Sequence, residues 1–96
     1  MKAGGLGPAA QIAAMADAAG VGCMMGCMLE SKVGITAAAA LSAGKAVITK
    51  NDLDAADLMA ADPVRGGITY DKDHLVVPDA PGLGITAIEG WQPLKD

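Results

Sequence analysis

The sequence has very few aromatic residues. Only 2% of its 96 residues are aromatic, with one Trp, one Tyr and no Phe, although 52% are hydrophobic. A small domain that folds alone usually relies on aromatic side chains for part of its core, and at this length it buries only about two-thirds of its unfolded surface. Together with 13 Gly and 6 Met, the composition predicts closely layered strands and helices that form one slice of a larger packed body.

Basic residues are also scarce. Seven Lys and Arg face eleven Asp and Glu, which gives a net charge of −4. Nucleic acid and anionic membrane surfaces are bound through clustered Lys and Arg, so both are excluded as expected partners. The imbalance is local, because residues 51–96 contain three basic and nine acidic residues.

The chain lacks a long uninterrupted apolar run. Asp17, Glu30, Lys32 and Lys45 break up its first half, whereas a membrane-spanning helix needs about 18 consecutive apolar residues. The first residues also contain Gly, Pro and Gln where the apolar region of a secretory peptide would run. We therefore expect a cytoplasmic protein.

Potential metal and disulfide residues are few. The cysteines, Cys23 and Cys27, are four positions apart in an apolar run, which on a strand separates them by roughly 13 Å, beyond disulfide reach. With His74 as the single histidine, a zinc site is poorly supplied. We expect two buried thiols that behave as small hydrophobic residues.

Residues 1–62 alternate between helical and strand patterns. Helical spacing follows Pro8 and stops at Gly20, and Ser31 can cap a second helix. The expected elements are a helix to residue 20, a strand over 21–28, a helix over 32–43, a strand over 46–53 and a helix over 55–61. The unbroken apolarity of 21–28 predicts a strand that is covered on both faces.

The tail has a different pattern. Residues 68–70 and 75–77 flank the polar segment 71–74, which predicts a β-hairpin with a four-residue loop. Residues 81–84 predict a turn, and the last dozen residues should be extended or irregular. We therefore divide the chain into a partial barrel, 1–62, and a hairpin and tail, 63–96, that returns toward a capping domain.

Strand ends near residues 2, 28 and 53 are about 25 residues apart. This βαβα spacing is typical of parallel sheets and of (β/α)8 barrels, in which a complete barrel takes roughly 250 residues. The fold class is therefore α/β. The chain contains three strand ends of such a barrel and is too short to form the other strands. We expect the chain to begin within one of the barrel strands.

Polar residues close these strands: Lys2, Glu30, and the pair Asp52 and Asp54. Functional residues of such barrels lie at the C-terminal ends of strands. The alternatives are a solvated terminal Lys2, and a Glu30 that only favours the start of a helix. Two carboxylates two positions apart on a strand share a face at about 7 Å and repel each other. Either a metal or ammonium cation relieves that repulsion, or both belong to a solvated loop edge.

Taken in order, these signals resemble the enolase superfamily. The segments that carry the resemblance are MKAGG (1–5), GCMMGCMLESKVGI (22–35), DLD (52–54), DPVRGGITY (62–70) and PDAPGLGI (78–85). The similarity covers about residues 1–85 of the C-terminal part of that family, in its muconate-lactonising subgroup. Within the subgroup it is nearest to the dipeptide epimerases of the L-Ala-D/L-Glu type.

The resemblance implies the last third of a modified (β/α)7β barrel with an α+β capping domain. It implies an isomerase that uses Mg²⁺ and removes and returns the α-proton beside a substrate carboxylate, through an enediolate. Lys2 corresponds to an acid/base lysine at the end of strand six. Asp52 and Asp54 correspond to the pair that binds the ammonium group of a dipeptide substrate. Glu30 corresponds to the acidic residue that ends strand seven.

Gly4 and Gly5 would let the backbone approach the substrate. In this family the metal ligands lie on strands three to five and the opposite base lies on strand two, so we expect this chain alone to bind no Mg²⁺. Two alternatives remain open. Instead of part of a dipeptide epimerase, the chain could be an inactive truncated barrel that self-associates through open edges. It could also be part of a muconate cycloisomerase or of an o-succinylbenzoate synthase. We also expect the N-terminal part of the barrel to be a binding partner that completes the enzyme.

Overall fold

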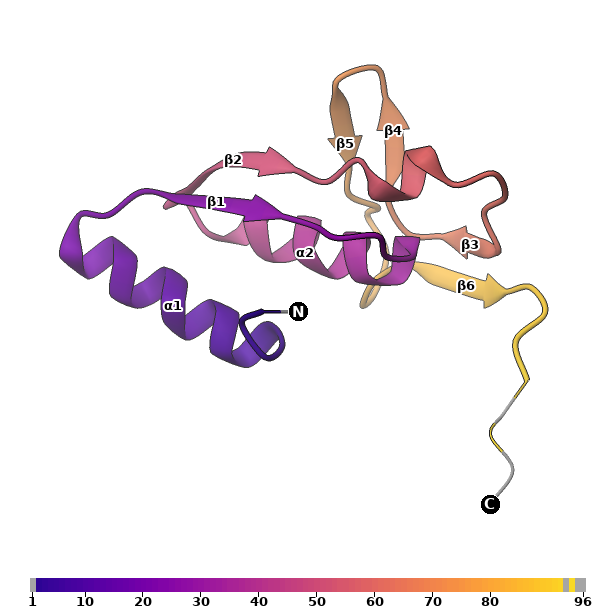
Figure 1. The fold of residues 1–96 in the computed structure, drawn as a ribbon, viewed down its shortest axis with the longest axis horizontal. Helices are drawn as coiled ribbons and strands as arrows, with labels where there is room; N and C mark the ends of the chain where they lie inside the picture. Colours follow the sequence, from indigo (N-terminus) through magenta and orange to yellow (C-terminus); the bar gives the residue numbers. More distant parts are fainter. Residues whose placement is uncertain (1, 93, 95–96) are drawn as a thin grey trace.

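The computed structural model describes residues 2–92 and 94 of an α/β chain. Its elements run in the order α1 (Leu6–Ala19), β1 (Cys23–Gly26), α2 (Lys32–Gly44), β2 (Ile48–Asp52), the 3₁₀ turn η1 (Ala55–Leu58), β3 (Val64–Gly66), β4 (Thr69–Asp71), β5 (His74–Val76) and β6 (Ile85–Ile88) (Figure 1). The strands of this described part form three two-stranded sheets, and they do not close into a barrel.

The first sheet confirms the predicted βαβ unit. β1 and β2 pair in parallel, and Gly26 lies opposite Asp52 in the register. The crossover α2 packs beneath both strands (Figure 1). Because parallel strands end at the same edge, the residues that follow β1 and β2 are brought to one end of the sheet.

Helix α1 follows the glycine signals of the sequence. Gly20 ends it in the left-handed conformation, with φ 68°, and its amide bonds the carbonyl of Asp17. Leu6, Ile12 and Met15 remain exposed on the helix. Among the helices of residues 2–92 and 94, none combines the length and apolarity needed to cross a bilayer.

The core lies between α2, β2 and the tail. Ile35 and Ile68 are fully buried, and Leu53 is 3% exposed. The buried hydroxyl of Thr36 accepts a hydrogen bond from the amide of Ile68 at 3.1 Å. Apolar burial and this polar contact together hold the tail against α2, as expected for buried polar groups that find partners.

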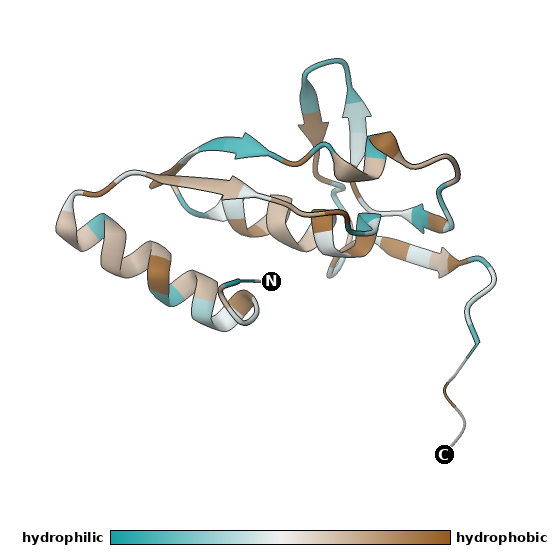
Figure 2. Ribbon diagram, viewed as in Figure 1, coloured by the Kyte–Doolittle hydropathy of each residue, from teal (hydrophilic) through white to brown (hydrophobic). Residues whose placement is uncertain are grey.

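The prediction that the first strand is covered on both faces is wrong for this chain. Residues of β1 alternate between half-buried and exposed, and Met24 is 64% exposed. Met25 instead packs against the core. One helix layer covers one face of the sheet, so the opposite face, which contains Met24, is open. Figure 2 shows the apolar colour of β1 beside the hydrophilic β2.

The predicted helix over 55–61 is only a single 3₁₀ turn, Ala55–Leu58. Met59 is already extended, with ψ 138°, and Pro63 disfavours helix in the residue before it. The few remaining residues cannot offset the cost of nucleating an α-helix. The buried side chains of Ala55 and Ala56 fix the turn against the core instead.

The predicted hairpin is present, with a shorter loop than expected. Asp71 pairs with His74, so the turn contains two residues, and Lys72 takes a left-handed φ of 56°. The tail is more ordered than predicted, because Ile85–Ile88 pairs antiparallel with Val64–Gly66. A three-residue strand shows no alternating pattern, and its partner is about 20 residues away, so local sequence signals could not predict this sheet.

A polar cluster joins this tail sheet to α2. One carboxylate oxygen of Asp62 lies 2.9 Å from Lys32 Nζ, and the other accepts a hydrogen bond from the Val64 amide at 3.0 Å. The Lys32 hydrogen bond and then the Val64 amide lower the pKa of Asp62 below its usual 3.8. The ionised form of Asp62 is therefore favoured by folding.

This pKa shift predicts that the stability of the folded chain decreases at acidic pH, which gives its pH profile an acid limb. Because the folded pKa is lowered, the contribution of Asp62 is complete above about pH 4 and is lost as pH falls through the folded pKa. We expect the thermal midpoint to fall less steeply below pH 4 in Asp62→Asn than in the wild type. At neutral pH the loss should stay within about 1 kcal/mol, since the carboxylate is partly exposed.

Thermal unfolding followed by circular dichroism between about pH 2 and pH 7 measures this effect. Lys32→Met removes the partner side chain, so it should flatten the acid limb in the same way, and the double variant should add little. Acid limbs of equal steepness in the wild type and in Asp62→Asn would show that another group controls acid unfolding.

Candidate functional site

Lys2 and Glu30, from two different strand ends of the sequence prediction, line the same cavity. It has a volume of about 340 Å³, and its wall includes Gly26 and Met28 near the end of β1. The Lys2 side chain is exposed, and it belongs to none of the ion pairs formed among residues 2–92 and 94. A lysine and a glutamate therefore border the same open space.

Glu30 is held by its own loop. Its Oε1 accepts a hydrogen bond from the Met28 amide at 3.4 Å. A Cβ added at Gly34, in the first turns of α2, would collide with Glu30 Oε2. Glycine at this position therefore lets the carboxylate lie against the start of the helix, where a negative charge is favoured by the helix dipole.

Gly4 and Gly5 line a second cavity of about 600 Å³ that also includes Glu30. Both glycines have positive φ, 89° and 130°, and a Cβ at either would make only ordinary contact with Pro8. Backbone conformation, rather than lack of space, therefore requires glycine here. The remaining walls are apolar and come from α1, β1 and α2.

Asp52 and Asp54 lie at the end of β2, on either side of the buried Leu53. Asp52 is the last residue of the strand, whereas Asp54 precedes the 3₁₀ turn with helical φ −91° and ψ −8° and makes no side-chain hydrogen bond to that turn. The expectation that the two carboxylates share one face of a strand is therefore wrong. Both carboxylates are exposed. The Cys27 thiol, just past the end of β1, lies 4.0 Å from Asp54 Oδ1.

The cysteines are only partly buried. Both are free thiols of intermediate exposure, and Cys27 packs against the core. The prediction of two buried thiols is therefore wrong, since both are partly exposed. One face of Cys27 behaves as a small hydrophobic residue, and its sulfur reaches the edge of the site.

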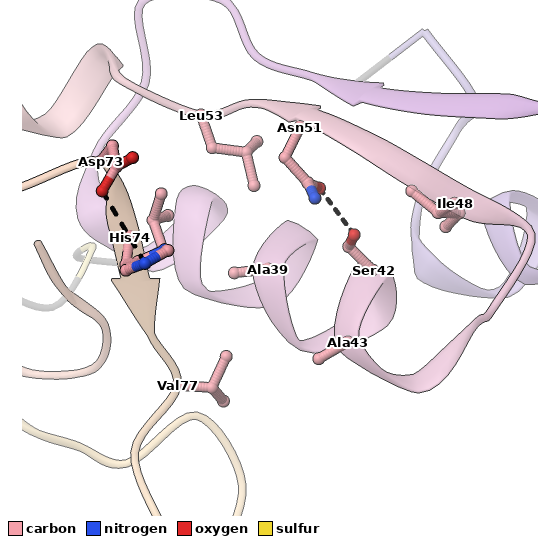
Figure 3. Close-up of a pocket in the computed structure, with 10 residues that line it drawn as sticks. Ala39, Ser42, Ala43, Ile48, Asn51, Leu53, Asp73, His74 and Val77 are labelled. Carbon is pink, nitrogen blue, oxygen red and sulfur yellow. Dashed lines mark hydrogen bonds and ion pairs between the residues drawn. The ribbon is translucent and has the colours of Figure 1, made fainter.

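A third cavity lies on the opposite side of β2, next to α2. Figure 3 shows Asn51 and Leu53 pointing from β2 toward α2, with the Ser42 hydroxyl donating to Asn51 Oδ1 at 2.6 Å. The cavity, about 350 Å³, is also lined by His74 of the hairpin. Since side chains alternate along a strand, Asp52 points to the other side, away from this cavity.

Gly26 connects the two parts of the site. It lines the cavities of about 340 Å³ and 600 Å³, which Glu30 also lines, and it is the register partner of Asp52. A Cβ added at Gly26 would meet nothing within 4 Å, so the space beside Asp52 is open. The structure thus brings Lys2 and Glu30 to one cavity, and it places the Asp52 and Asp54 pair at the neighbouring strand end rather than in the cavity wall.

Residues 2–92 and 94 do not assemble a metal centre. They contain no cluster of three or more His, Cys, Asp or Glu side chains that could hold an ion. The paired Asp52 and Asp54 supply two carboxylates without a third ligand. Mg²⁺ requires oxygen ligands in a near-ideal octahedron, and the described residues offer no group of three or more side chains that could supply them.

Sequence reasoning missed Tyr70. Its hydroxyl donates a hydrogen bond to the carbonyl of Leu53 at 2.5 Å, between the two aspartates. Burial, followed by the negative charge of Asp57, raises the pKa of Tyr70. The available signal was that Tyr70 is the single tyrosine of a chain with almost no aromatic residues.

Comparison with known proteins gives consistent matches. Residues 1–91 match the enolase C-terminal domain-like family. The L-Ala-D/L-Glu epimerase of Clostridium acetobutylicum is 51% identical over 88 residues, which are 92% of this chain and 25% of that protein. The chain therefore spans about a quarter of the length of the curated relatives it matches.

Solved structures agree with the sequence comparison. A substrate-liganded complex of the L-Ala-D/L-Glu epimerase from Bacillus subtilis matches 88% of this chain and 24% of its own, with a TM-score of 0.86 and 48% identity. A dipeptide epimerase from Methylococcus capsulatus, complexed with Mg and the dipeptide L-Arg-D-Lys, matches 85% of this chain and 23% of its own, with a TM-score of 0.81 and 39% identity.

Proposed function

We propose, because this chain belongs to the enolase C-terminal domain-like family, that it supplies one wall of the active site of a dipeptide epimerase. Several of its relatives are epimerases that act on dipeptides. The remaining walls belong to further barrel strands outside the residues described. In the described part of the chain β1 has a free edge, which is suited to a neighbouring strand.

Lys2 is the proposed acid/base group of this wall. Its exposed side chain lines the cavity that Glu30 also lines. In its neutral form the amine removes the α-proton of one epimer, and in its ammonium form it donates a proton to the same face of the carbon when the other epimer reacts. Epimerisation also needs a second acid/base group on the opposite face, which we assign to another part of the barrel.

Asp52 and Asp54 are the proposed site for the substrate ammonium group. The two carboxylates are exposed at and just past one strand end, where a cationic group would be attracted to both. An ammonium carries three N–H donors, enough to reach both carboxylates with charge-assisted hydrogen bonds. Open space beside Gly26, opposite Asp52, leaves room for the substrate backbone.

Glu30, Gly4 and Gly5 are proposed to contact the rest of the substrate. Glu30 lies between the two cavities, and the glycines leave one of them without side chains on that wall. The bare backbone there lets a substrate approach closely.

We place the ligands of the Mg²⁺ used by the complete enzyme outside this chain. The metal would stabilise negative charge on the substrate carboxylate. The described residues form no such ligand cluster, so their own part is limited to proton transfer and substrate positioning.

The observation that carries this proposal is that Gly26 links the Lys2 and Glu30 cavity to the strand end that bears Asp52. The test is a chimaera in which this chain replaces the matching quarter of the Bacillus subtilis epimerase. We expect the chimaera, in buffer with Mg²⁺, to convert L-Ala-L-Glu into L-Ala-D-Glu, as measured by chiral chromatography. A folded chimaera without this activity would contradict the proposal.

A second candidate function, structural self-association, is favoured by the open face of the first sheet. Met24 and Met28 are 64% and 60% exposed, and in the described part of the chain β1 and β2 each have a free edge. Exposed edges and apolar patches promote pairing. In this reading the chain alone is inactive and forms an oligomer.

For the isolated chain we expect sedimentation velocity to show a dimer or a larger species. Met24→Lys should shift the population toward monomer, because it places a charge on the open face. Val76→Lys, on the hairpin, is the matched control and should not. A compact monomer at all concentrations would exclude self-association through this face.

A further inference from the structure

The hydroxyl of Tyr70 holds the peptide between the two aspartates. Tyr70 lies on β4, and its Oη donates to the Leu53 carbonyl at 2.5 Å. The β1–β2 pairing ends at Asp52, so Leu53 lies beyond the ladder. The hairpin thus supplies a hydrogen bond to the first residue that the sheet no longer holds.

The Leu53 side chain is fixed as well. It is 3% exposed and belongs to the core cluster, against which the Tyr70 ring packs. A residue held through both its side chain and its carbonyl has little freedom to rotate. Leu53 lies directly between Asp52 and Asp54, and the carbonyl that Tyr70 binds belongs to the peptide that joins Leu53 to Asp54.

We propose that Tyr70 is a positioning residue that orients Asp52 and Asp54 toward a cationic group of the substrate. The inference rests on the proposed function, in which this pair binds an ammonium. It assigns to the hairpin, which contributes no residue to the Lys2 and Glu30 cavity, a role in substrate affinity.

The protonation of Tyr70 suits this role. Burial and the nearby Asp57 raise the pKa of its hydroxyl above the ordinary 10.0. The hydroxyl therefore stays protonated, and remains a donor to the Leu53 carbonyl, over the pH range in which the substrate amine is charged.

The chain offers a matched control for the loss of this contact. Thr36 accepts a buried hydrogen bond from the Ile68 amide, two residues before Tyr70. This bond also ties the tail to the body of the molecule, but it touches neither aspartate. Thr36→Val therefore weakens the attachment of the same segment without releasing the Leu53 carbonyl.

In the chimaera, we expect Tyr70→Phe to raise KM for L-Ala-L-Glu about fivefold to tenfold, the effect of one lost hydrogen bond, with kcat little changed. Thr36→Val should lower the thermal midpoint and leave KM unchanged. Placing 4-aminophenylalanine at position 70 retains an N–H donor and should restore KM. Equal KM values for Tyr70→Phe and the wild type, or equal rises for both variants, would overturn the proposal.

A measurement on the chain itself separates this inference from the proposed function. In ¹³C NMR, Tyr70→Phe should shift the Leu53 carbonyl and both the Asp52 and Asp54 carboxylate signals, whereas Thr36→Val should leave them in place. If these shifts are observed but the wild-type chimaera is inactive, the epimerase function is refuted. The proposal that Tyr70 positions the aspartates is then retained. Unshifted carboxylate signals in Tyr70→Phe would refute the positioning role whether or not the chimaera is active.

Discussion

The Lys2→Met variant of the chimaera is expected to lose about 10²- to 10⁴-fold in kcat for L-Ala-L-Glu, the range attributed to one general acid/base group. Methionine preserves much of the length and apolar body of the side chain but cannot carry a proton. Lys2 is exposed and lines the cavity shared with Glu30, so its replacement should leave the fold intact.

Lys45→Met is the matched control for the Lys2 substitution. Lys45 is an exposed lysine that follows α2 at the far end of the sheet, and its loss removes the same charge without touching the cavity. Chiral chromatography of the reaction mixture gives both rates. A Lys2→Met enzyme with at least half of the wild-type kcat would exclude Lys2 as an acid/base group.

Replacing Asp52 and Asp54 together by Asn should lower kcat/KM for L-Ala-L-Glu about 10²- to 10³-fold. Removing the charged partner of a desolvated ion pair costs roughly 2–5 kcal/mol, and the two carboxylates are proposed to share one ammonium. The loss should be much smaller for N-acetyl-L-Ala-L-Glu, which has no ammonium group. This contrast distinguishes a dipeptide epimerase from a muconate cycloisomerase or o-succinylbenzoate synthase, whose substrates lack an amine.

The same double change at Asp71 and Asp73 provides the control. These aspartates have the same spacing and exposure, but they lie at the tip of the hairpin. Steady-state kinetics with both substrates should leave this control close to the wild type. If the Asp52 and Asp54 variant loses activity equally toward the free and the acetylated dipeptide, the pair has a role other than ammonium binding.

The sequence correctly predicted helices and strands whose formation depends on residues close together in the chain. Gly20 ends α1 because the left-handed conformation favours glycine. The apolar run 21–28 and the βαβα spacing predicted a parallel sheet, and β1 and β2 do pair in parallel, connected by α2. Helix and strand patterns of this kind depend on neighbouring residues, so they can be read along the chain.

Features that depend on distant partners were not predictable. The pairing of β3 with β6 joins segments about 20 residues apart, and neither strand has an alternating pattern. The open face at Met24 follows from how few layers this chain contains, whereas an apolar run predicts only that a strand can be covered. The predicted helix over 55–61 failed for a third reason, since Pro63 limited its length.

In the candidate site, too, residues near predicted strand ends could be identified from the sequence, whereas contacts between distant segments could not. Lys2, Glu30, Asp52 and Asp54 could be proposed because each follows a predicted strand. The contact between Tyr70 and the Leu53 carbonyl could not, because it depends on where the hairpin folds back against β2. The division into residues 1–62 and 63–96 stays a prediction, although contacts such as this one join the two parts.

The most direct test of the proposed active-site wall is α-proton exchange in D₂O by the folded chimaera, followed by ¹H NMR separately from L-Ala-L-Glu and from L-Ala-D-Glu. We expect deuterium to enter the α-position from both epimers, and Lys2→Met to abolish exchange from one of them. The parent Bacillus subtilis enzyme, measured under the same conditions, is the positive control. Absence of deuterium from both epimers in the chimaera would contradict the claim that this chain supplies a working wall of the epimerase site.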